Sequence, residues 1–203
     1  MTDNTRGTDL LYGPRQALTP NSLNAAKDGE GKVPDMSKTE NAWQALRTGN
    51  ERFVAGTPRS PDHTSPSRLA VAVDERPPVA VVFGCAESSA TAEMVFDQDD
   101  GQVLVISTLG HATGDAVLGS LEYAVQILDV PLVVVLGHDH CCAVQSILAA
   151  RHVVSTGMSL IQRSPVIAAK VHDGSCAVAF ATYDSTDGHV HLHGSIGNID
   201  ELC

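Results

Sequence analysis

The sequence predicts an α/β fold built on a mostly parallel sheet of about four strands, with an antiparallel edge strand and flanking helices. Two observations lead to this prediction. Aliphatic and β-branched runs recur at 79–84, 103–107, 132–136 and 177–183, which is typical of strands buried on both faces. Segments of helical character alternate with these runs, and strand–helix alternation favours parallel pairing through crossover helices.

Helices are expected before and between the strands. Residues 37–40, Ser-Lys-Thr-Glu, have capping-box spacing, so a helix should begin there and end near Gly56. Residues 115–128 repeat aliphatic side chains at helical spacing, which indicates an amphipathic helix. Asp187-Gly188 is a hairpin turn signal and predicts a short antiparallel strand over 189–193. Further helices are expected at 88–96, 142–150 and 159–171, the last kinked or broken at Pro165.

The bulk composition limits the function classes that fit this chain. A length of 203 residues and an apolar share of 43% suit one domain, expected at 37–203 behind a flexible N-terminal arm at 1–36. The formal net charge of -11 repels phosphate backbones, so no nucleic-acid partner is expected. No apolar run is long enough for a membrane helix, and the first residues lack the features of a secretory signal.

Cysteine and histidine residues stand where two of the buried strands end. The chain has five cysteines at irregular spacing, which predicts free thiols in a reducing, cytoplasmic compartment. Cys85 follows one strand, and His138 and Cys141 follow another. Because neighbouring parallel strands present their carboxyl ends at one edge, these three side chains are expected to converge on one metal ion. Thiolates and imidazole favour zinc, and three protein ligands leave a fourth position open, as in catalytic sites.

The same segments resemble the β-class carbonic anhydrase family. Family members carry Cys-x-Asp-x-Arg after the first strand and Gly-His-x-x-Cys-Gly after the third, whereas this chain reads Cys-Ala-Glu-Ser-Ser at 85–89 and Gly-His-Asp-His-Cys-Cys at 137–142. The resemblance runs from about residue 40 to the C-terminus and includes 42–46, 49–53, 96–98, 110–111, 119–125, 183–184 and 187–188. It implies zinc held by Cys85, His138 and Cys141, in a homodimer or a larger homo-oligomer.

The resemblance also implies a reaction and a substrate pocket. The family hydrates CO2 to bicarbonate, and a hydroxide bound to zinc attacks the carbon atom. Leu104 and Tyr123 match family positions near the substrate cavity, although both residue types also suit the hydrophobic core. His111 and Cys142 are further pocket candidates, and His111 also suits a role as a turn cap.

Four positions around the metal depart from the family pattern. Glu87 replaces the family Asp, and Ser89 replaces the Arg that holds this Asp off the zinc. Cys142 replaces a glycine, and Arg76 lies near a position where many members carry a Gln that contacts bicarbonate. Two outcomes are open: Glu87 binds zinc as a fourth ligand and closes the site, or Arg76 pairs with Glu87 and the site stays open. Catalytic roles are therefore expected for Glu87 and Arg76.

These departures leave three hypotheses for the function. The first is zinc-dependent CO2 hydration with reduced or altered activity. The second is hydrolysis of another small electrophile, carbonyl sulfide or carbon disulfide, because the family resemblance includes enzymes of that kind. The third is a non-catalytic homologue that zinc stabilises, with Glu87 as the permanent fourth ligand.

Other histidines and cysteines have alternative interpretations. His189, His191 and His193 share one face of the expected edge strand. Such a face is either solvated, part of an interface, or a second metal site. His140 and Cys142 are alternative metal ligands, although the family register favours their neighbours His138 and Cys141.

Overall fold

The computed structural model describes residues 37–59, 77–144 and 149–199. These residues belong to one compact unit, Asp35–Cys203. The expected arm at 1–36 lies outside the described residues and stays a prediction.

The core of the unit is a five-stranded sheet in the order β2-β1-β3-β4-β5. The first four strands in this order are parallel, and β5 is antiparallel to β4. This arrangement confirms the predicted parallel sheet with an antiparallel edge strand. The strands are β1 (Ala80–Cys85), β2 (Val103–Thr108), β3 (Leu132–His138), β4 (Ala177–Tyr183) and β5 (Val190–Ile196).

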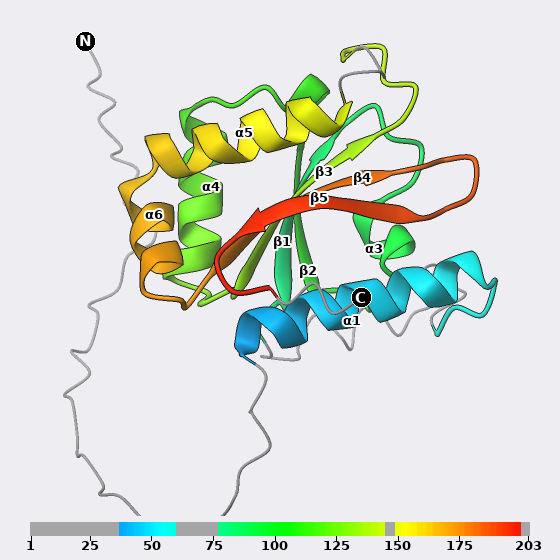
Figure 1. Ribbon diagram of the computed structural model, residues 1–203, viewed down its shortest axis with the longest axis horizontal. Coiled ribbons are helices and arrows are strands. Elements are labelled where there is room, and N and C mark those ends of the chain that lie inside the picture. The colour runs from blue at the N-terminus through cyan, green and yellow to red at the C-terminus, as the bar shows by residue number, and fades with distance from the viewer. Residues whose placement is uncertain (1–36, 60–76, 145–148, 200–203) are drawn as a thin grey trace, which may run out of the picture. The chain divides into compact units, whose positions relative to one another are not determined.

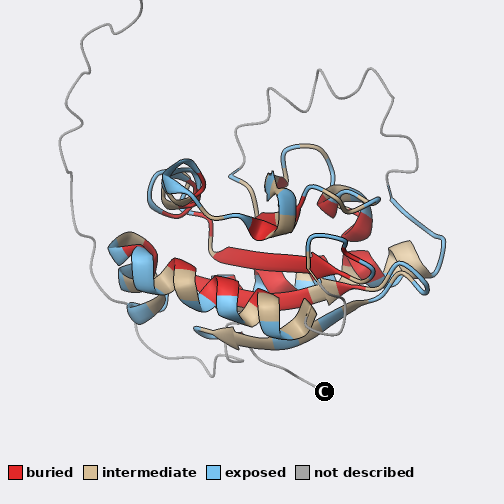
Figure 2. Ribbon diagram, turned by 90° about the horizontal axis from the view of Figure 1, so that it is seen from above, coloured by how far each residue is buried: buried red, intermediate tan, exposed pale blue. Residues whose placement is uncertain are grey.

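Helices cover both faces of the sheet (Figure 1). One face packs against α1 (Lys38–Val54) and α3 (Ala92–Val95), and the other packs against α4 (Asp115–Gln126), α5 (Ala149–Arg163) and α6 (Pro165–His172). A short 3-10 helix, η1 (Leu109–His111), follows β2. Seen from above, the central strands are buried, whereas the helices carry exposed residues on their outer sides (Figure 2). Among the described residues, no helix has the length and apolar character needed to cross a membrane.

The central strands β1 and β3 are buried on both faces, as their aliphatic sequences predict. Ala80 and Val82 point into the core on the α1 side, whereas Val81 and Phe83 point into the core on the α4 and α5 side. All residues of β3 are buried. This alternation follows from the two-residue repeat of a strand, and it fixes which side of the sheet each strand-end residue faces.

Helix α1 is tied to the rest of the unit at both ends. The predicted capping box at its start is present, with Ser37 and Glu40 each bonding the other's backbone N–H. Near its end, the side chain of Asn50 donates to the carbonyl oxygens of Val95 at 3.0 Å and of Gly188 at 2.8 Å. These bonds hold α3 and the β4–β5 hairpin against the helix.

Two helical predictions differ from the structure, and a third is confirmed. The expected helix at 88–96 is only the four residues of α3, because a loop held by the bond from Ser88 Oγ to the carbonyl of Ala90 precedes it. Residues 142–144 are not helical, and α5 instead begins at Ala149 and runs through 151–158, where no helix was expected. The predicted break near Pro165 is confirmed, because this proline opens α6.

Candidate metal centre

Two strand ends bring four metal-binding side chains together. β1 ends at Cys85 and β3 ends at His138, and these two strands are parallel neighbours. Glu87 follows β1 by two residues, and Cys141 follows β3 by three. One potential ligand atom from each of these four residues lies within 4.8 Å of the other three. The structure therefore brings together the three predicted zinc ligands and the predicted fourth ligand, which we call the candidate metal centre.

The ring of His138 is oriented as in a metal ligand. Its Nδ1 lies 2.8 Å from the carbonyl oxygen of Asp139, and because a carbonyl only accepts, Nδ1 carries the hydrogen. Nε2 of the neutral ring is then an acceptor, and it is buried with no hydrogen-bond partner among the described residues. A buried acceptor without a hydrogen-bond or metal partner is unfavourable. In metal-binding histidines, the ring nitrogen that does not bind the metal typically donates to a carbonyl oxygen.

The sulfur atoms of Cys85 and Cys141 complete a donor set that suits zinc. They lie 3.8 Å apart, and both residues are buried. The peptide N–H of Gly110 donates to Cys85 Sγ at 3.3 Å. Burial raises the pKa of the Cys141 thiol to about 11, and the adjacent Glu87 adds to this rise. Metal binding must therefore displace a proton from Cys141 at neutral pH.

Glu87 is held beside the metal ligands by backbone donors. Its Oε2 accepts the N–H of Cys142 at 2.8 Å and of Ala143 at 3.3 Å, and it lies 3.2 Å from Cys141 Sγ. Hydrogen bonds from the side chains of Cys142 and Cys141, together with those from the peptide N–H groups of Cys142 and Ala143, lower the pKa of Glu87 to about 2. The carboxylate is therefore ionised at every pH at which zinc binding is relevant.

The predicted arginine partner of Glu87 is not among the described residues. Arg76 lies outside them, so its pairing with Glu87 stays a prediction. Ser89, which stands at the family arginine position, is exposed. In the described part of the chain, Glu87 accepts hydrogen bonds from a thiol and two peptide N–H groups of the loop after β3, and not from a guanidinium group.

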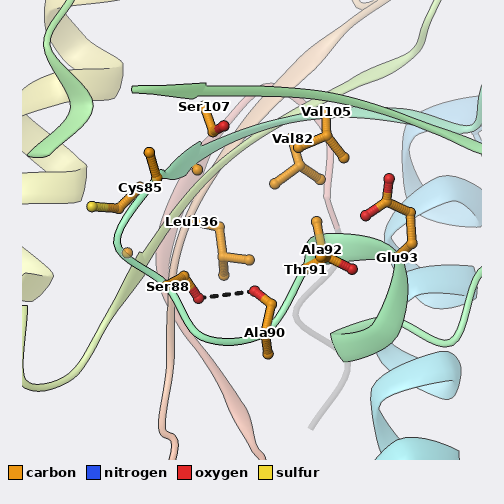
Figure 3. A pocket seen from close by; sticks show the side chains of 13 residues that line it. Val82, Cys85, Ser88, Ala90, Thr91, Ala92, Glu93, Val105, Ser107 and Leu136 are labelled. Carbon is orange, nitrogen blue, oxygen red and sulfur yellow. Dashed lines mark hydrogen bonds between the residues drawn. The ribbon is translucent and has the colours of Figure 1, made fainter. Parts of the chain in front are cut away.

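A cavity of about 280 Å³ lies next to the end of β1 (Figure 3). Figure 3 shows Cys85 at one end and Glu93 at the other, with the apolar side chains of Val82, Val105 and Leu136 between them. The Cys85 sulfur points away from these side chains. The cavity also reaches Gly84, where an added Cβ would meet no atom within 4 Å. The missing side chain of this glycine therefore leaves space in the cavity.

A smaller, polar cavity of about 170 Å³ lies next to two residues of the candidate metal centre. Glu87 and His138 line it together with side chains from the end of β4 and from the loops after β3 and β4: Tyr183, Asp139, His140 and Ser185. His140 is exposed and pairs with Asp139 at 3.3 Å, and it is not part of the candidate metal centre. The polar cavity therefore borders the predicted metal position, whereas the apolar cavity meets the candidate metal centre only at Cys85, whose sulfur points away from it.

The predicted pocket residues fall in different places. His111 is buried next to Cys85 and His138, and its Nε2 donates to the carbonyl of Leu136 at 3.0 Å. Burial lowers the pKa of His111 to about 4, so its ring is neutral. Cys142 lies beside Glu87, as described above. Leu104 packs into the core on the α4 side, and Tyr123 is exposed on α4, so neither lines the two cavities.

Sequence reasoning missed two contributors to this region. His152 on α5 donates to the carbonyl of Gly110 at 3.1 Å, and its ring centroid lies 5.4 Å from that of His111. Its only sequence signal is its position shortly after the metal-binding loop. The peptide N–H groups of Cys142 and Ala143 carried no signal, because every residue except proline has one.

Fold and site together define a class of protein: a parallel α/β protein with a thiolate–imidazole metal centre at the carboxyl edge of its sheet. The sequence model of a family described as carbonic anhydrase matches residues 80–158. This range contains all four residues of the candidate metal centre.

Relatives extend the match over most of the chain. Carbonic anhydrase 2 of Mycobacterium tuberculosis is 40% identical over 198 residues, which cover 79% of this chain and 95% of the relative. The carbonic anhydrase of Mycolicibacterium smegmatis is 38% identical over 199 residues, covering 79% and 96%. The chain belongs to the β-carbonic anhydrase family, as its motifs predicted.

Solved structures show the same fold. The β-carbonic anhydrase CcaA has a TM-score of 0.57 at 17% identity and covers 77% of this chain and 99% of its own. A tetrameric β-carbonic anhydrase from Sordaria macrospora has a TM-score of 0.56 at 16% identity, with 76% and 98% covered. At these identities the similarity establishes the fold.

Proposed function

We propose that this chain is a zinc-dependent lyase that hydrates CO2 to bicarbonate, with activity altered by Glu87 and Ser89. The main support is the buried, unpartnered Nε2 of His138 next to the sulfur atoms of Cys85 and Cys141. This donor set fits zinc and not magnesium or calcium. A zinc ion bound there would supply the Lewis acidity that makes water a nucleophile near neutral pH.

The residues around the metal position would prepare the reactants. The carbonyl of Asp139 fixes the ring of His138, so that Nε2 faces the ion. The polar cavity that Glu87 and His138 line would give CO2 and water a path to this position, and holding them there would raise the rate. The apolar cavity of Val82, Val105 and Leu136 lies away from the Cys85 sulfur.

Glu87 would act as a fixed hydrogen-bond acceptor near the metal. Its Oε2 is held by peptide N–H groups, and its low pKa keeps it ionised. An ionised carboxylate can orient a reacting water by accepting a hydrogen bond from it. The same carboxylate also lies within ligand distance of the other three donors, so it competes with water for the fourth position, and we expect lower activity than in relatives.

Stopped-flow measurement of CO2 hydration by the zinc-loaded chain, between pH 6 and pH 9, tests the proposal. We expect a rate above the buffer reaction that a chelator removes and that Cys85→Ser abolishes. No rate above buffer at any pH would contradict lyase activity. A Glu87→Ala variant then separates the two roles of the carboxylate, because a higher rate means that Glu87 blocks the metal and a lower rate means that it assists. Glu51→Ala, an exposed carboxylate on α1, is the control.

Two alternative functions each have one supporting observation. The apolar cavity of about 280 Å³ is large for CO2 and suits the longer carbonyl sulfide or carbon disulfide; turnover of these without CO2 hydration would select this function. The four-donor group supports a non-catalytic homologue closed by Glu87. No turnover by the wild type, together with turnover by Glu87→Ala, would favour this last function.

We also propose a homodimer or larger homo-oligomer in a reducing, cytoplasmic location. β2 is an edge strand of the sheet, and the exposed apolar side chains Val105, Leu109, Tyr123 and Ile127 lie on β2, η1 and α4. Such a surface is typical of an interface. The reducing location follows from Cys85 and Cys141, whose close sulfur atoms would form a disulfide under oxidising conditions and lose the metal.

A further inference from the structure

The β4–β5 hairpin carries a second group of metal-binding side chains, which shares no residue with the candidate metal centre. Asp184 directly follows β4, Asp187 lies in the turn, and His191 lies on β5. One potential ligand atom from each of these three residues lies within 4.8 Å of the other two. Carboxylate oxygen and imidazole nitrogen together suit divalent transition metals.

His189 adds a second imidazole to this group. Its Nδ1 lies 3.3 Å from Oδ1 of Asp187. Its ring and that of His191 are stacked, with centroids 6.3 Å apart and planes inclined by 28°. Residues two apart in an extended chain share a face, and both rings are exposed. Both side chains can therefore turn toward one ion, whose bonds to nitrogen are about 2 Å long.

The third histidine of this face has a different partner. Nε2 of His193 lies 2.7 Å from Oγ1 of Thr182. This contact gives one of its two ring nitrogens a partner, and His193 belongs to neither group of candidate ligands among the described residues. The sequence pattern joined His189, His191 and His193 in one face, whereas the structure separates the first two, which adjoin carboxylates, from the third.

The backbone of the hairpin is held in place before any ion binds. Asp184 and His189 form a backbone bond at 2.9 Å, and the N–H of Gly188 donates to the carbonyl of Asp184 at 2.9 Å. Asn50 of α1 accepts the N–H of Val190 at 2.9 Å and donates to Gly188. Metal binding therefore requires little further ordering of the hairpin, and this small entropic cost favours affinity.

We propose that Asp184, Asp187, His189 and His191 form a second binding site, for a divalent transition metal ion such as zinc, cobalt or nickel. The two imidazoles select these ions over magnesium and calcium. Asp184 and Asp187 each use Oδ1 for a bond to the hairpin backbone, and their Oδ2 atoms are available to an ion. Because the group is exposed, it binds its ion more weakly than the buried centre and exchanges it readily.

Equilibrium dialysis of the full chain against buffered Zn²⁺, followed by metal analysis, tests this site. We expect two zinc ions per wild-type chain at saturation, of which the weaker is lost on dialysis against metal-free buffer. The double variant His189→Ala with His191→Ala should keep the tight ion and bind the second at least tenfold more weakly. Equal second binding by wild type and the double variant would overturn the proposal, as would one ion at saturation in the wild type.

Two further variants separate this site from its surroundings. His193→Ala is the matched control, because it removes an exposed imidazole from the same strand, and it should retain the second ion. Cys85→Ser should lose the tight ion and retain the weak one, so failure of the candidate metal centre and failure of the hairpin site give different results. Circular dichroism of each variant checks that the hairpin substitutions leave the fold intact. Excess Mg²⁺ should not displace the second ion.

Discussion

At the scale of single residues, Glu87 shows how a backbone can fix a charged side chain. Peptide N–H groups from the loop after β3 hold its Oε2. A peptide donor cannot rotate away as a long side chain can, so less ordering is needed to keep the carboxylate in place. Removal of a charged side-chain partner, as at Ser89, therefore does not release Glu87 into solvent. The negative charge remains next to the metal ligands.

His111 makes the stability of the fold sensitive to acid. Burial lowers the pKa of His111 from 6.5 to about 4 in the folded chain, whereas the unfolded chain has the ordinary value. Below pH 6.5 the unfolded state binds the proton more readily, so stability falls as the pH drops toward 4, by up to about 3 kcal/mol. Urea unfolding of metal-free His111→Gln against wild type, from pH 7 to pH 4.5, measures this. An equal loss of stability in both proteins would contradict it.

Part of the site could be predicted from residues, and part could not. Cys85, His138 and Cys141 stand at strand ends, so their meeting follows from the parallel pairing of β1 and β3. The anchoring of Glu87 could not be predicted, because its donors are peptide groups 55 and 56 residues away in the sequence. The division of the hairpin histidines also depends on rotamers, which residue spacing does not determine.

At the scale of elements, Gly157 decides how closely α5 approaches the sheet. A Cβ at this position would lie 2.1 Å from Cε1 of Phe180 on β4. The absent side chain allows the helix and the ring to pack in contact. α5 contains the β-branched residues Val153, Val154 and Thr156, which are only moderate helix formers. Packing on β4, and not propensity alone, therefore stabilises this helix.

Two glycine substitutions test this packing. Gly157→Ala should destabilise the fold by about 1–3 kcal/mol, because overpacking exceeds the gain in helix propensity. Gly119→Ala on α4 is the matched control: its Cβ would meet no atom within 4 Å, so it should stabilise by about 0.5–1 kcal/mol. Urea denaturation of both variants measures the difference. Similar effects of the two substitutions would show that α5 does not depend on this contact.

An element could be predicted from the sequence where local signals were sufficient, and not where its state depends on a distant contact. α1 has its capping box and β3 its unbroken aliphatic run, so local signals were sufficient. The middle of α5 has no strong local signal, and its helical state depends on Phe180, which is distant in sequence. The short α3 was predicted too long because composition does not show that Ser88 closes a loop.

At the scale of the whole molecule, large apolar side chains remain exposed near the edge strand β2, although the chain has a net charge of -11. Ile127 at the end of α4 is 63% exposed, and Leu109 in η1 is 64% exposed. Leu109 lies in η1, which follows the edge strand β2, and Ile127 directly follows α4, which contacts β2. An edge strand with apolar neighbours is a natural surface for association with a second copy.

Substitution of Ile127 tests this association. We expect the wild-type chain to sediment as a dimer or larger species, and Ile127→Asp to weaken association at least tenfold, because a charge would be buried. Met158→Asp, on α5, is the control for an exposed apolar side chain elsewhere. Sedimentation velocity over a range of concentrations measures both. A monomeric wild type, or equal effects of the two variants, would contradict the proposed interface.

The separation of Cys85 and Cys141 by 56 residues has a consequence for biosynthesis. During translation, Cys85 is synthesised before His138 and Cys141, and at that stage β1 cannot yet pair with β3. A metal ion held by ligands from both strands would therefore bind only after the strands have paired. Until that moment the early thiol is exposed to competing chemistry, so a cell that makes this protein needs the second half of the sheet to form promptly.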